Sequence, residues 1–290
     1  MTKQITFIDL FAGIGGFHLA FHNLGAKCVF ASEWDKYARE TYRANFHDIS
    51  PNLFDNNDRL FAGDITKVNA SSIPDFDILT GGFPCQPFSQ AGLKKGFSEA
   101  RGTLFFDVAR IIKAKQPKAF FLENVRGLLT HDSGRTFATI KMILTEDLGY
   151  SLYYKVVKAS DFGLPQHRPR LYMVGFKDKS IDFEFPPAIP LKMTMSDVFE
   201  GEAEREIGFT LRVGGRHSNI NDRRNWDAYI VDGKVRQLTP KEAKRMQGFP
   251  DDYVFPVSDS QAMKQLGNSV AVPAVQAVGA KVVEKLKWPN

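Results

Sequence analysis

One cysteine of this chain lies in a setting that suits a reactive thiol better than a core residue. The run Gly81-Gly-Phe-Pro-Cys85-Gln-Pro places Cys85 between two prolines, shortly after two glycines. Glycine and proline are poor residues for the interior of a core strand, and a thiolate is a strong nucleophile. We therefore predict that Cys85 is a nucleophile. Cys28, which lies in an apolar run, is predicted to be a core residue.

Charged side chains border two other apolar runs. Glu123 ends one run, and Arg168 and Arg170 precede another. Taken singly, a capping acid and a pair of solvated arginines are equally open interpretations. Three such groups in addition to Cys85 favour a single site.

A glycine-rich segment near the start of the chain suggests a second ligand. The run Phe7–Gly16 is an apolar stretch that enters a glycine loop, and such a loop lets backbone N–H groups approach a ligand at a helix N-terminus. Glu33 follows at the distance of a ribose-binding acid in dinucleotide folds, and Trp34 offers an aromatic face for a purine. The third glycine of the dinucleotide fingerprint is replaced by His18. The pattern favours an adenosine-containing ligand that is not a dinucleotide, with a plain tight turn as the alternative for this segment alone.

These groups require a scaffold that brings strand ends together. Short β-branched or aromatic runs alternate with amphipathic stretches over the first 176 residues, as in a Rossmann-like, mostly parallel α/β sheet with helices on both faces. Open sheets of this kind bind ligands at the carboxyl ends of their strands. The predicted strands are Ile5–Leu10, Cys28–Ser32, Phe76–Thr80, Ala119–Leu122, Ser151–Val157 and Leu171–Phe176. The predicted helices are Gly16–Leu24, Trp34–Asn45, Thr103–Lys115 and Arg135–Leu148.

The sequence changes character after this region. Prolines, mixed charges and glycines predict a small irregular domain over residues 186–256, inserted into a larger domain formed by residues 1–185 and 257–290. The run Thr239-Pro-Lys-Glu242 has the pattern of a helix start. A last helix, Pro273–Lys285, is apolar enough to pack on the sheet.

Composition excludes several classes of protein. The chain has 290 residues, 43% of them hydrophobic, with a net charge of +5 and two cysteines. Two cysteines without a CxxC motif predict neither a disulfide scaffold nor a metal site. No apolar run approaches the roughly 20 residues of a membrane span, and the N-terminus lacks a signal-peptide core. We therefore expect an intracellular protein without a membrane role.

The motifs occur in an order that closely resembles the cytosine-C5 DNA methyltransferases of bacteria and their phages. The resemblance runs through most of the chain, although the region between Arg170 and Arg236 is short for the family's target-recognition region. Its methyl-donor motifs and nucleophile loop match Phe7–Gly16, Glu33-Trp34, Gly63-Asp64-Ile65 and Gly81–Ser89. Further motifs match Gly102–Asp107, Glu123–Val125, Gln166–Arg170, Arg236–Gly248 and Gln265–Val270.

The resemblance implies that S-adenosylmethionine is the methyl donor and S-adenosylhomocysteine the product, with no metal. The Cys85 thiolate would add to C6 of a cytosine that is flipped out of the duplex. Glu123 would hydrogen-bond the cytosine's N3 and amino edge, and Arg168 or Arg170 would lower the pKa of the thiol. The implied donor-binding residues are Phe11, Gly13, Ile14, Gly15, Gly16, Glu33, Trp34, Asp64, Ile65, Pro84, Leu104, Asn268 and Val270.

Two segments are expected to contact DNA. The glycine-containing run after the nucleophile carries Lys94, Lys95 and Arg101 and is predicted to close over the flipped base. The predicted recognition segment carries four arginines against one acid between Gly208 and Arg224, and arginine suits the major-groove edge of guanine. For any single arginine a contact to the DNA backbone is the alternative. The predicted contacts in this segment are Thr210, Arg212, Gly214, Gly215, Arg216, Arg223 and Arg224.

Three other functions compete with DNA methylation. An RNA cytosine-5 methyltransferase would use the same chemistry, a non-catalytic DNA-binding relative would need a broken site, and a nicotinamide oxidoreductase is disfavoured by the missing glycine. The expected partner is double-stranded DNA with a specific cytosine site. We further expect a monomer in the bacterial cytosol, with a companion restriction endonuclease as a candidate partner.

Overall fold

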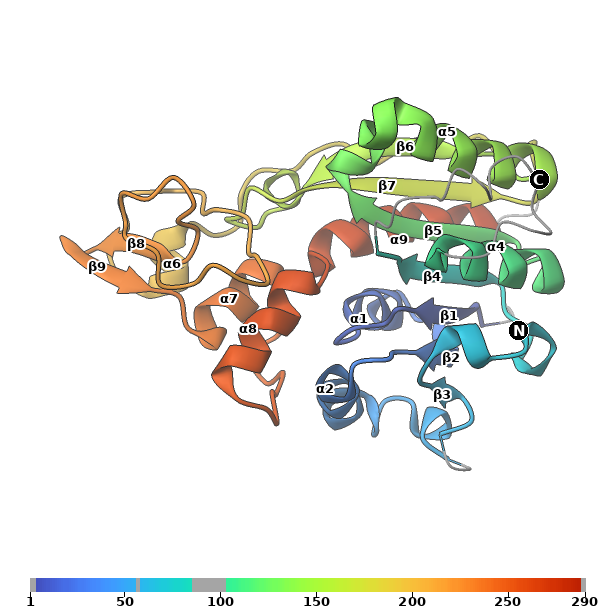
Figure 1. Ribbon diagram of the computed structural model, residues 1–290, viewed down its shortest axis with the longest axis horizontal. Coiled ribbons are helices and arrows are strands. Elements are labelled where there is room, and N and C mark those ends of the chain that lie inside the picture. The colour runs from blue at the N-terminus through green and yellow to red at the C-terminus, as the bar shows by residue number, and fades with distance from the viewer. Residues whose placement is uncertain (1–3, 56–57, 85–102, 288–290) are drawn as a thin grey trace.

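A seven-stranded sheet forms the centre of the protein (Figure 1). The computed structural model describes residues 4–55, 58–84 and 103–287. The strand order is β3-β2-β1-β4-β5-β7-β6, in which β7 runs antiparallel to both of its neighbours and the first five strands are mutually parallel. The strands are β1 Thr6–Leu10, β2 Lys27–Ser32, β3 Phe61–Ala62, β4 Ile78–Gly82, β5 Ala119–Val125, β6 Tyr153–Lys158 and β7 Pro169–Phe176.

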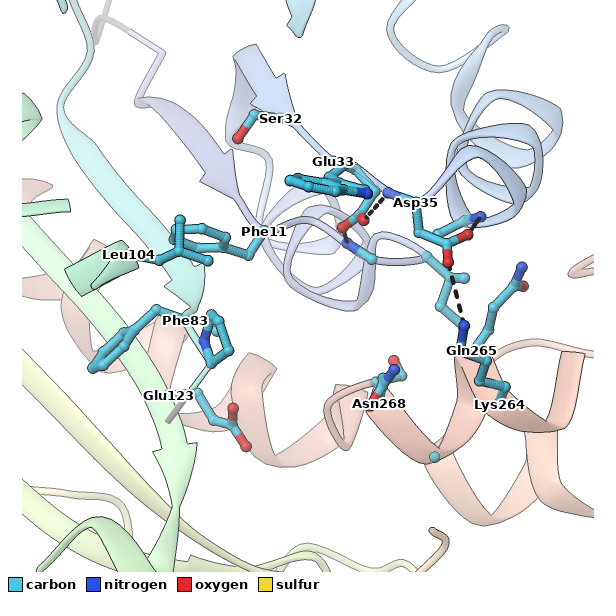
Figure 2. Close-up of a pocket in the computed structure, with 18 of the residues that line it drawn as sticks. Phe11, Ser32, Glu33, Asp35, Phe83, Leu104, Glu123, Lys264, Gln265 and Asn268 are labelled. Atoms are coloured by element: carbon cyan, nitrogen blue, oxygen red, sulfur yellow. Dashed lines mark hydrogen bonds and ion pairs between the residues drawn. The ribbon is translucent and has the colours of Figure 1, made fainter. Parts of the chain in front are cut away.

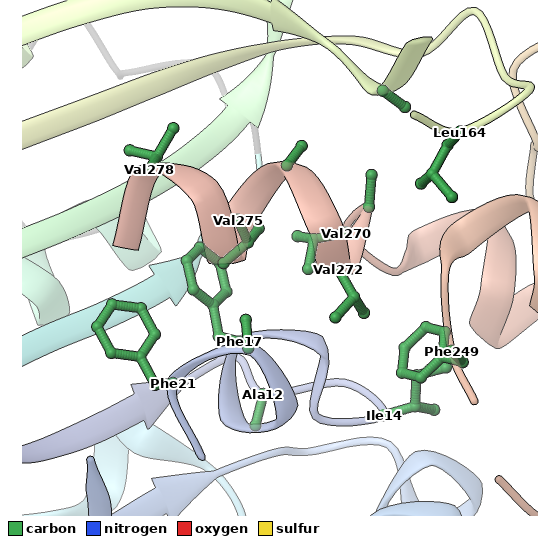
Figure 3. Packing of buried hydrophobic residues seen from close by; sticks show 14 of the residues in the cluster. Ala12, Ile14, Phe17, Phe21, Leu164, Phe249, Val270, Val272, Val275 and Val278 are labelled. Atoms are coloured by element: carbon green, nitrogen blue, oxygen red, sulfur yellow. The ribbon is translucent and has the colours of Figure 1, made fainter. Parts of the chain in front are cut away.

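Helices cover both faces of this sheet, as the alternation of apolar side chains requires. On β1, Phe7 packs into the core beneath α1 and α9, whereas Ile8 packs into the core beneath α4 and α5. Figure 3 shows Phe17 and Phe21 of α1 facing the valines of α9. The helices are α1 Gly16–Asn23, α2 Lys36–Phe46, α4 Leu104–Lys115, α5 Arg135–Met142 and α9 Val272–Lys287. The predicted mostly parallel α/β fold is confirmed.

Several predicted boundaries are wrong by a few residues. The helix expected from Trp34 begins at Lys36, because the Asp35 side chain caps it by accepting hydrogen bonds from the Tyr37 and Ala38 N–H groups at 2.9 and 3.1 Å. β5 extends to Val125, so Glu123 lies within the strand. The helix expected to reach Leu148 is α-helical only to Met142 and continues as a π-helix over Ile143–Asp147.

A second group of elements lies beside the sheet. Figure 1 places α6 Met195–Phe199 and the β8–β9 hairpin away from the seven strands, with α7 Pro240–Gln247 and α8 Asp259–Asn268 between them. The capping box of Thr239 and Glu242 at the start of α7 is confirmed. The hairpin, β8 Ala228–Val231 and β9 Lys234–Gln237, turns at Asp232-Gly233, where both residues have positive φ. An Asp-Gly pair is a standard hairpin signal that sequence reasoning missed.

One described segment, Asp259–Lys287, is long and apolar enough to cross a membrane by length and composition alone. Within the protein, 67% of its most apolar window is buried. The valines of α9 contact the phenylalanines of α1 in the core (Figure 3). The segment therefore has the burial of a core helix.

Candidate active site

A cavity of about 420 Å³ opens at the carboxyl ends of the parallel strands (Figure 2). It lies where β1 and β4 are neighbours and the strand order reverses, the position at which open α/β sheets bind ligands. Ten of the thirteen predicted donor-binding residues line it: Phe11, Gly13, Ile14, Glu33, Trp34, Asp64, Ile65, Pro84, Leu104 and Asn268. Glu123, Arg168 and Arg170 line the same cavity.

The remaining three predicted residues, Gly15, Gly16 and Val270, do not line the cavity but pack behind it. Gly15 has φ +80°, and a Cβ atom there would lie 2.2 Å from the Phe46 ring of α2. A Cβ atom on Gly16 would lie 2.5 Å from Cγ2 of Val270. These residues therefore let α2 and the C-terminal segment pack closely on the glycine loop.

Glu33 is held in one position by two backbone donors. The Gly13 N–H donates to Oε2 and the Asp35 N–H donates to Oε1, both at 2.7 Å. Burial raises the pKa of this carboxyl, although the two hydrogen bonds oppose that change. A fixed acceptor at the end of β2 is suited to a diol such as the ribose of an adenosine.

The cavity walls also fit an adenosine-containing amino acid in their chemistry. Phe11 and Trp34 supply aromatic surface, and Trp34 is 78% exposed. Ser32 and Gln265 line the cavity and are almost fully buried, and neither Ser32 Oγ nor Gln265 Nε2 has a hydrogen-bond partner within the described part of the chain. Buried polar atoms without partners are uncommon in native proteins, and a polar ligand would account for them.

Sequence reasoning placed Asn268 of α8 at this cavity but did not single out Lys264 or Gln265, which also line it. Lys264 forms an ion pair with Asp35 (Figure 2), in which Nζ lies 3.5 Å from Oδ2. Gln265 Oε1 accepts a hydrogen bond from Thr41 at 2.9 Å. Both contacts join α8 to α2 across more than 220 residues of sequence, and no local pattern encodes such a distant contact.

Glu123 and Arg170 form a buried ion pair at the edge of the cavity. Arg170 Nε lies 2.9 Å from Glu123 Oε1, and the two side chains are only 15% and 12% exposed. Because β7 is antiparallel to β5, the beginning of β7 lies at the same sheet edge as the end of β5. Burial raises the pKa of Glu123, and the charges of Arg170 and Arg168 oppose that shift.

Arg168 joins three parts of the chain. Its side chain is buried and donates hydrogen bonds to the carbonyls of Leu211, Gly267 and Ser269, at 3.0, 2.9 and 2.5 Å. Burial lowers its pKa to about 9. In the structure Arg168 therefore holds the segments around Leu211 and Gly267–Ser269 against the start of β7. Its predicted catalytic role stays a prediction.

The segment that leads to the nucleophile is anchored by Asn124. Its Nδ2 donates to the Phe83 carbonyl at 2.8 Å, directly before Pro84. Cys85, Lys94, Lys95 and Arg101 lie outside the described residues. Cys28 is buried, as predicted, and burial raises the pKa of its thiol. In the described ranges, no three His, Cys, Asp or Glu side chains gather as a metal site would need.

The predicted recognition segment is attached to this edge of the sheet through its main chain. The His167 N–H donates to the Gly208 carbonyl at 2.9 Å, and the Leu211 N–H donates to Gln166 Oε1 at 3.0 Å. The Thr210 hydroxyl donates to the carbonyl of His167. We call these contacts of residues 208–211 with residues 165–168 the recognition seam.

The model of the family described as C-5 cytosine-specific DNA methylase matches this chain over residues 5–208 and 199–284. Type II methyltransferase M.SsoII of Shigella sonnei is 44% identical over 315 residues, covering 96% of this chain and 80% of that protein. M.HpaII of Haemophilus parainfluenzae is 44% identical over 337 residues, with 99% and 91% covered. M.HhaI of Haemophilus parahaemolyticus is 40% identical over 330 residues, with 99% and 97% covered.

These alignments are longer than the 290 residues of this chain, so the relatives carry residues that it lacks. The two family matches overlap over residues 199–208, within the predicted recognition domain.

Two solved structures share the fold. A putative DNA modification methyltransferase encoded within an Escherichia coli prophage has a TM-score of 0.74 at 22% identity, covering 98% of this chain and 100% of that one. Dnmt2 of S. pombe has a TM-score of 0.72 at 18% identity, covering 99% and 100%. At these identities the likeness shows the fold alone. The family match and the relatives show that this chain belongs to the C-5 cytosine-specific DNA methylases and is a DNA cytosine-5 methyltransferase that uses S-adenosylmethionine.

Proposed function

We propose that this enzyme methylates one cytosine within a specific duplex site, as the modification enzyme of a Type II restriction–modification system. The observation that carries the proposal is the buried Glu123–Arg170 pair, which lines the same cavity as the predicted donor-binding residues. The relatives named above are Type II methyltransferases.

Glu123 and Arg170 would act on the cytosine ring. Glu123 is a carboxyl with a raised pKa, and such a group can hydrogen-bond N3 and the amino group of a flipped cytosine. This bond stabilises the ring as electrons move into it. Arg170 keeps the Glu123 side chain in place and supplies a positive charge at the same edge.

Cys85 would provide the nucleophile. Its thiolate adds to C6, which makes C5 electron-rich enough to take the methyl group. A base, such as a water molecule in the site, then removes the C5 proton, and the C6–S bond breaks to release Cys85. The donor supplies the methyl group, and Glu33, Trp34 and Asn268 would hold it in the cavity.

The enzyme would act as a monomer in the bacterial cytosol without a bound metal, and a companion endonuclease would cleave the same site when it is unmethylated.

Bisulfite sequencing of DNA from cells that express the chain tests the proposal, with Cys85→Ser as the control. We expect protected cytosines in one sequence context with the wild-type chain, and none with the variant. A duplex with 5-fluorocytosine at that site should trap a covalent adduct with the wild-type chain only. Transfer of a labelled methyl group to tRNA in preference to DNA, or the absence of an adduct, would overturn the proposal.

A further inference from the structure

The four arginines of the predicted recognition segment differ in what holds their side chains. Arg216 donates from Nη2 to the Leu238 carbonyl at 3.1 Å, and its Nε lies 3.6 Å from the carboxylate of Asp227. Arg224 places its guanidinium on the Asp222 carboxylate through Nε and Nη2, at 3.1 and 2.8 Å. Both arginines therefore have partners inside the protein.

Arg212 and Arg223 are different. Like Arg224, both are exposed, but no side chain or carbonyl of the described ranges forms a hydrogen bond or an ion pair with either guanidinium. A guanidinium carries five N–H donors in a planar fork that suits phosphate and the guanine edge. Arg212 and Arg223 have these donors free.

The main chain beneath Arg212 is fixed at the catalytic edge. The preceding residue, Leu211, is bound at its carbonyl by Arg168 and at its N–H by Gln166. The backbone of Arg212 packs so closely on Gly267 of α8 that a Cβ atom there would lie 2.5 Å from the Arg212 carbonyl. Gly267 and Arg168 both line the active-site cavity, so the backbone of Arg212 lies next to residues of that cavity.

The main chain beneath Arg223 is held by a turn. The Asp222 N–H donates to the Asn219 carbonyl and the Asn225 N–H donates to the Asp222 carbonyl, both at 2.8 Å. Asn225 is itself buried and bonded to Ala228 at the start of β8. The Arg223 guanidinium is therefore unpaired within the described residues, while the turn that carries it is held in place by hydrogen bonds.

Asp227 explains why Arg216 is turned inward. Its carboxylate is fully buried, accepts the His217 N–H at 3.0 Å, and has Arg216 as its neighbouring cation. A buried carboxylate without a cation is costly. Removing the Arg216 charge would disturb Asp227 and, through it, the backbone at His217, which has a positive φ of 63°.

We propose that Arg212 and Arg223 are the arginines of this segment that contact DNA, whereas Arg216 and Arg224 are positioning residues that act through Asp227 and Asp222. Arg212 contacts the strand next to the flipped cytosine, and Arg223 contacts the duplex farther from it. The inference rests on the proposed methylation of a specific duplex site.

The test compares Arg212→Ala and Arg223→Ala with the matched variants Arg216→Ala and Arg224→Ala in the full chain. Two quantities are measured: the salt dependence of binding to a duplex with the mapped site, and methylation across a library of altered sites. If an arginine contacts a phosphate, removing it should reduce the magnitude of the slope of log K for DNA binding against log salt concentration by about one. If an arginine contacts a base, removing it should relax the sequence preference at that one position of the site.

We expect one of these two changes for Arg212→Ala and for Arg223→Ala. For Arg216→Ala we expect an unchanged slope and a higher KM for DNA at all sites alike, with unchanged kcat and rescue by Arg216→Lys. Arg224→Ala should likewise leave both the slope and the site preference unchanged.

The inference is overturned if Arg216→Ala or Arg224→Ala lowers the slope or relaxes one position, or if Arg212→Ala or Arg223→Ala does neither. Binding of S-adenosylhomocysteine confirms that each variant is folded. If the wild-type chain methylates no DNA, the proposed function fails; if it does so and the variants behave otherwise than expected, only this inference fails.

Discussion

Glu123 combines burial, a cation and access to the active-site cavity in one residue. Its carboxyl has a raised pKa, so the protonated form is more accessible than for an ordinary glutamate. Substitution Glu123→Gln keeps the shape but removes the acid. We expect kcat to fall by about 10²-fold or more, the usual contribution of a positioned acid or base, with unchanged affinity for S-adenosylhomocysteine by calorimetry. A variant with near-normal kcat would show that Glu123 serves only the ion pair.

His18 should make stability depend on pH. The ring is buried and stacked on Phe46 at 4.1 Å, and its nitrogens contact Tyr42 and Ser50 at 2.6 and 3.2 Å. Burial lowers its pKa to about 3. The unfolded chain therefore binds a proton near pH 6.5 that the folded chain does not bind, and stability falls as pH drops below 6.5.

Linkage predicts that His18 alone lowers the free energy of unfolding by about 1.4 kcal/mol between pH 7.5 and 5.5. Urea unfolding at several pH values measures this loss, with His18→Gln as the comparison. The variant should be less stable overall but should show a smaller change over this range. An equal change in both proteins would assign the pH dependence to other groups.

At the scale of elements, the glycine loop between β1 and α1 offers a matched pair of substitutions. Gly13 and Gly15 both have positive φ, 55° and 80°, but a Cβ atom has open space at Gly13 and meets the Phe46 ring at Gly15. Gly13→Ala should cost about 1–2 kcal/mol from backbone strain alone. Gly15→Ala adds a steric clash, which costs a further 1–3 kcal/mol or so. Denaturant unfolding of the two variants checks this order, and equal losses would contradict it.

The elements themselves were largely predictable, because each central strand is an apolar run bounded by polar residues. Direction was not predictable: nothing in the apolar pattern of Leu171–Phe176 indicates that β7 is antiparallel. That direction nevertheless brings Arg170, near the start of β7, within 2.9 Å of Glu123, near the end of β5. The sequence pattern identified Glu123 and Arg170 as candidate site residues, but only the fold showed that they form an ion pair.

The sequence also did not show which residues of the glycine loop between β1 and α1 face the cavity. Gly15 and Gly16 match a donor-binding motif, yet they serve packing against Phe46 and Val270. At α8, Lys264 and Gln265 line the cavity but were not predicted as site residues, although Gln265 begins the matched motif Gln265–Val270. A motif shows that a segment is near a ligand but does not show which of its residues face that ligand.

At the scale of the whole molecule, Gly267 is the point where α8, the active-site cavity and the recognition segment meet. A Cβ atom there would lie 2.5 Å from the backbone of Arg212. Gly267→Ala should push the recognition segment outward, raise the KM for DNA, and lower stability by about 1–3 kcal/mol. Gly127→Ala, where the space is open, is the control. Initial rates at varied DNA concentration and urea unfolding measure both effects, and a Gly267→Ala variant as active and stable as the control would contradict the expectation.

The recognition seam has a consequence for how this enzyme can evolve. The catalytic edge holds residues 208–211 mainly through carbonyls and N–H groups, which every non-proline residue possesses. Substitutions in the loop beyond the seam leave these attachments in place, and no part of Glu123, Arg170 or the donor cavity depends on that loop's side chains. If this loop reads the DNA site, as we propose, a lineage of such enzymes can acquire a new target sequence by changing the loop while the residues of the catalytic edge stay the same.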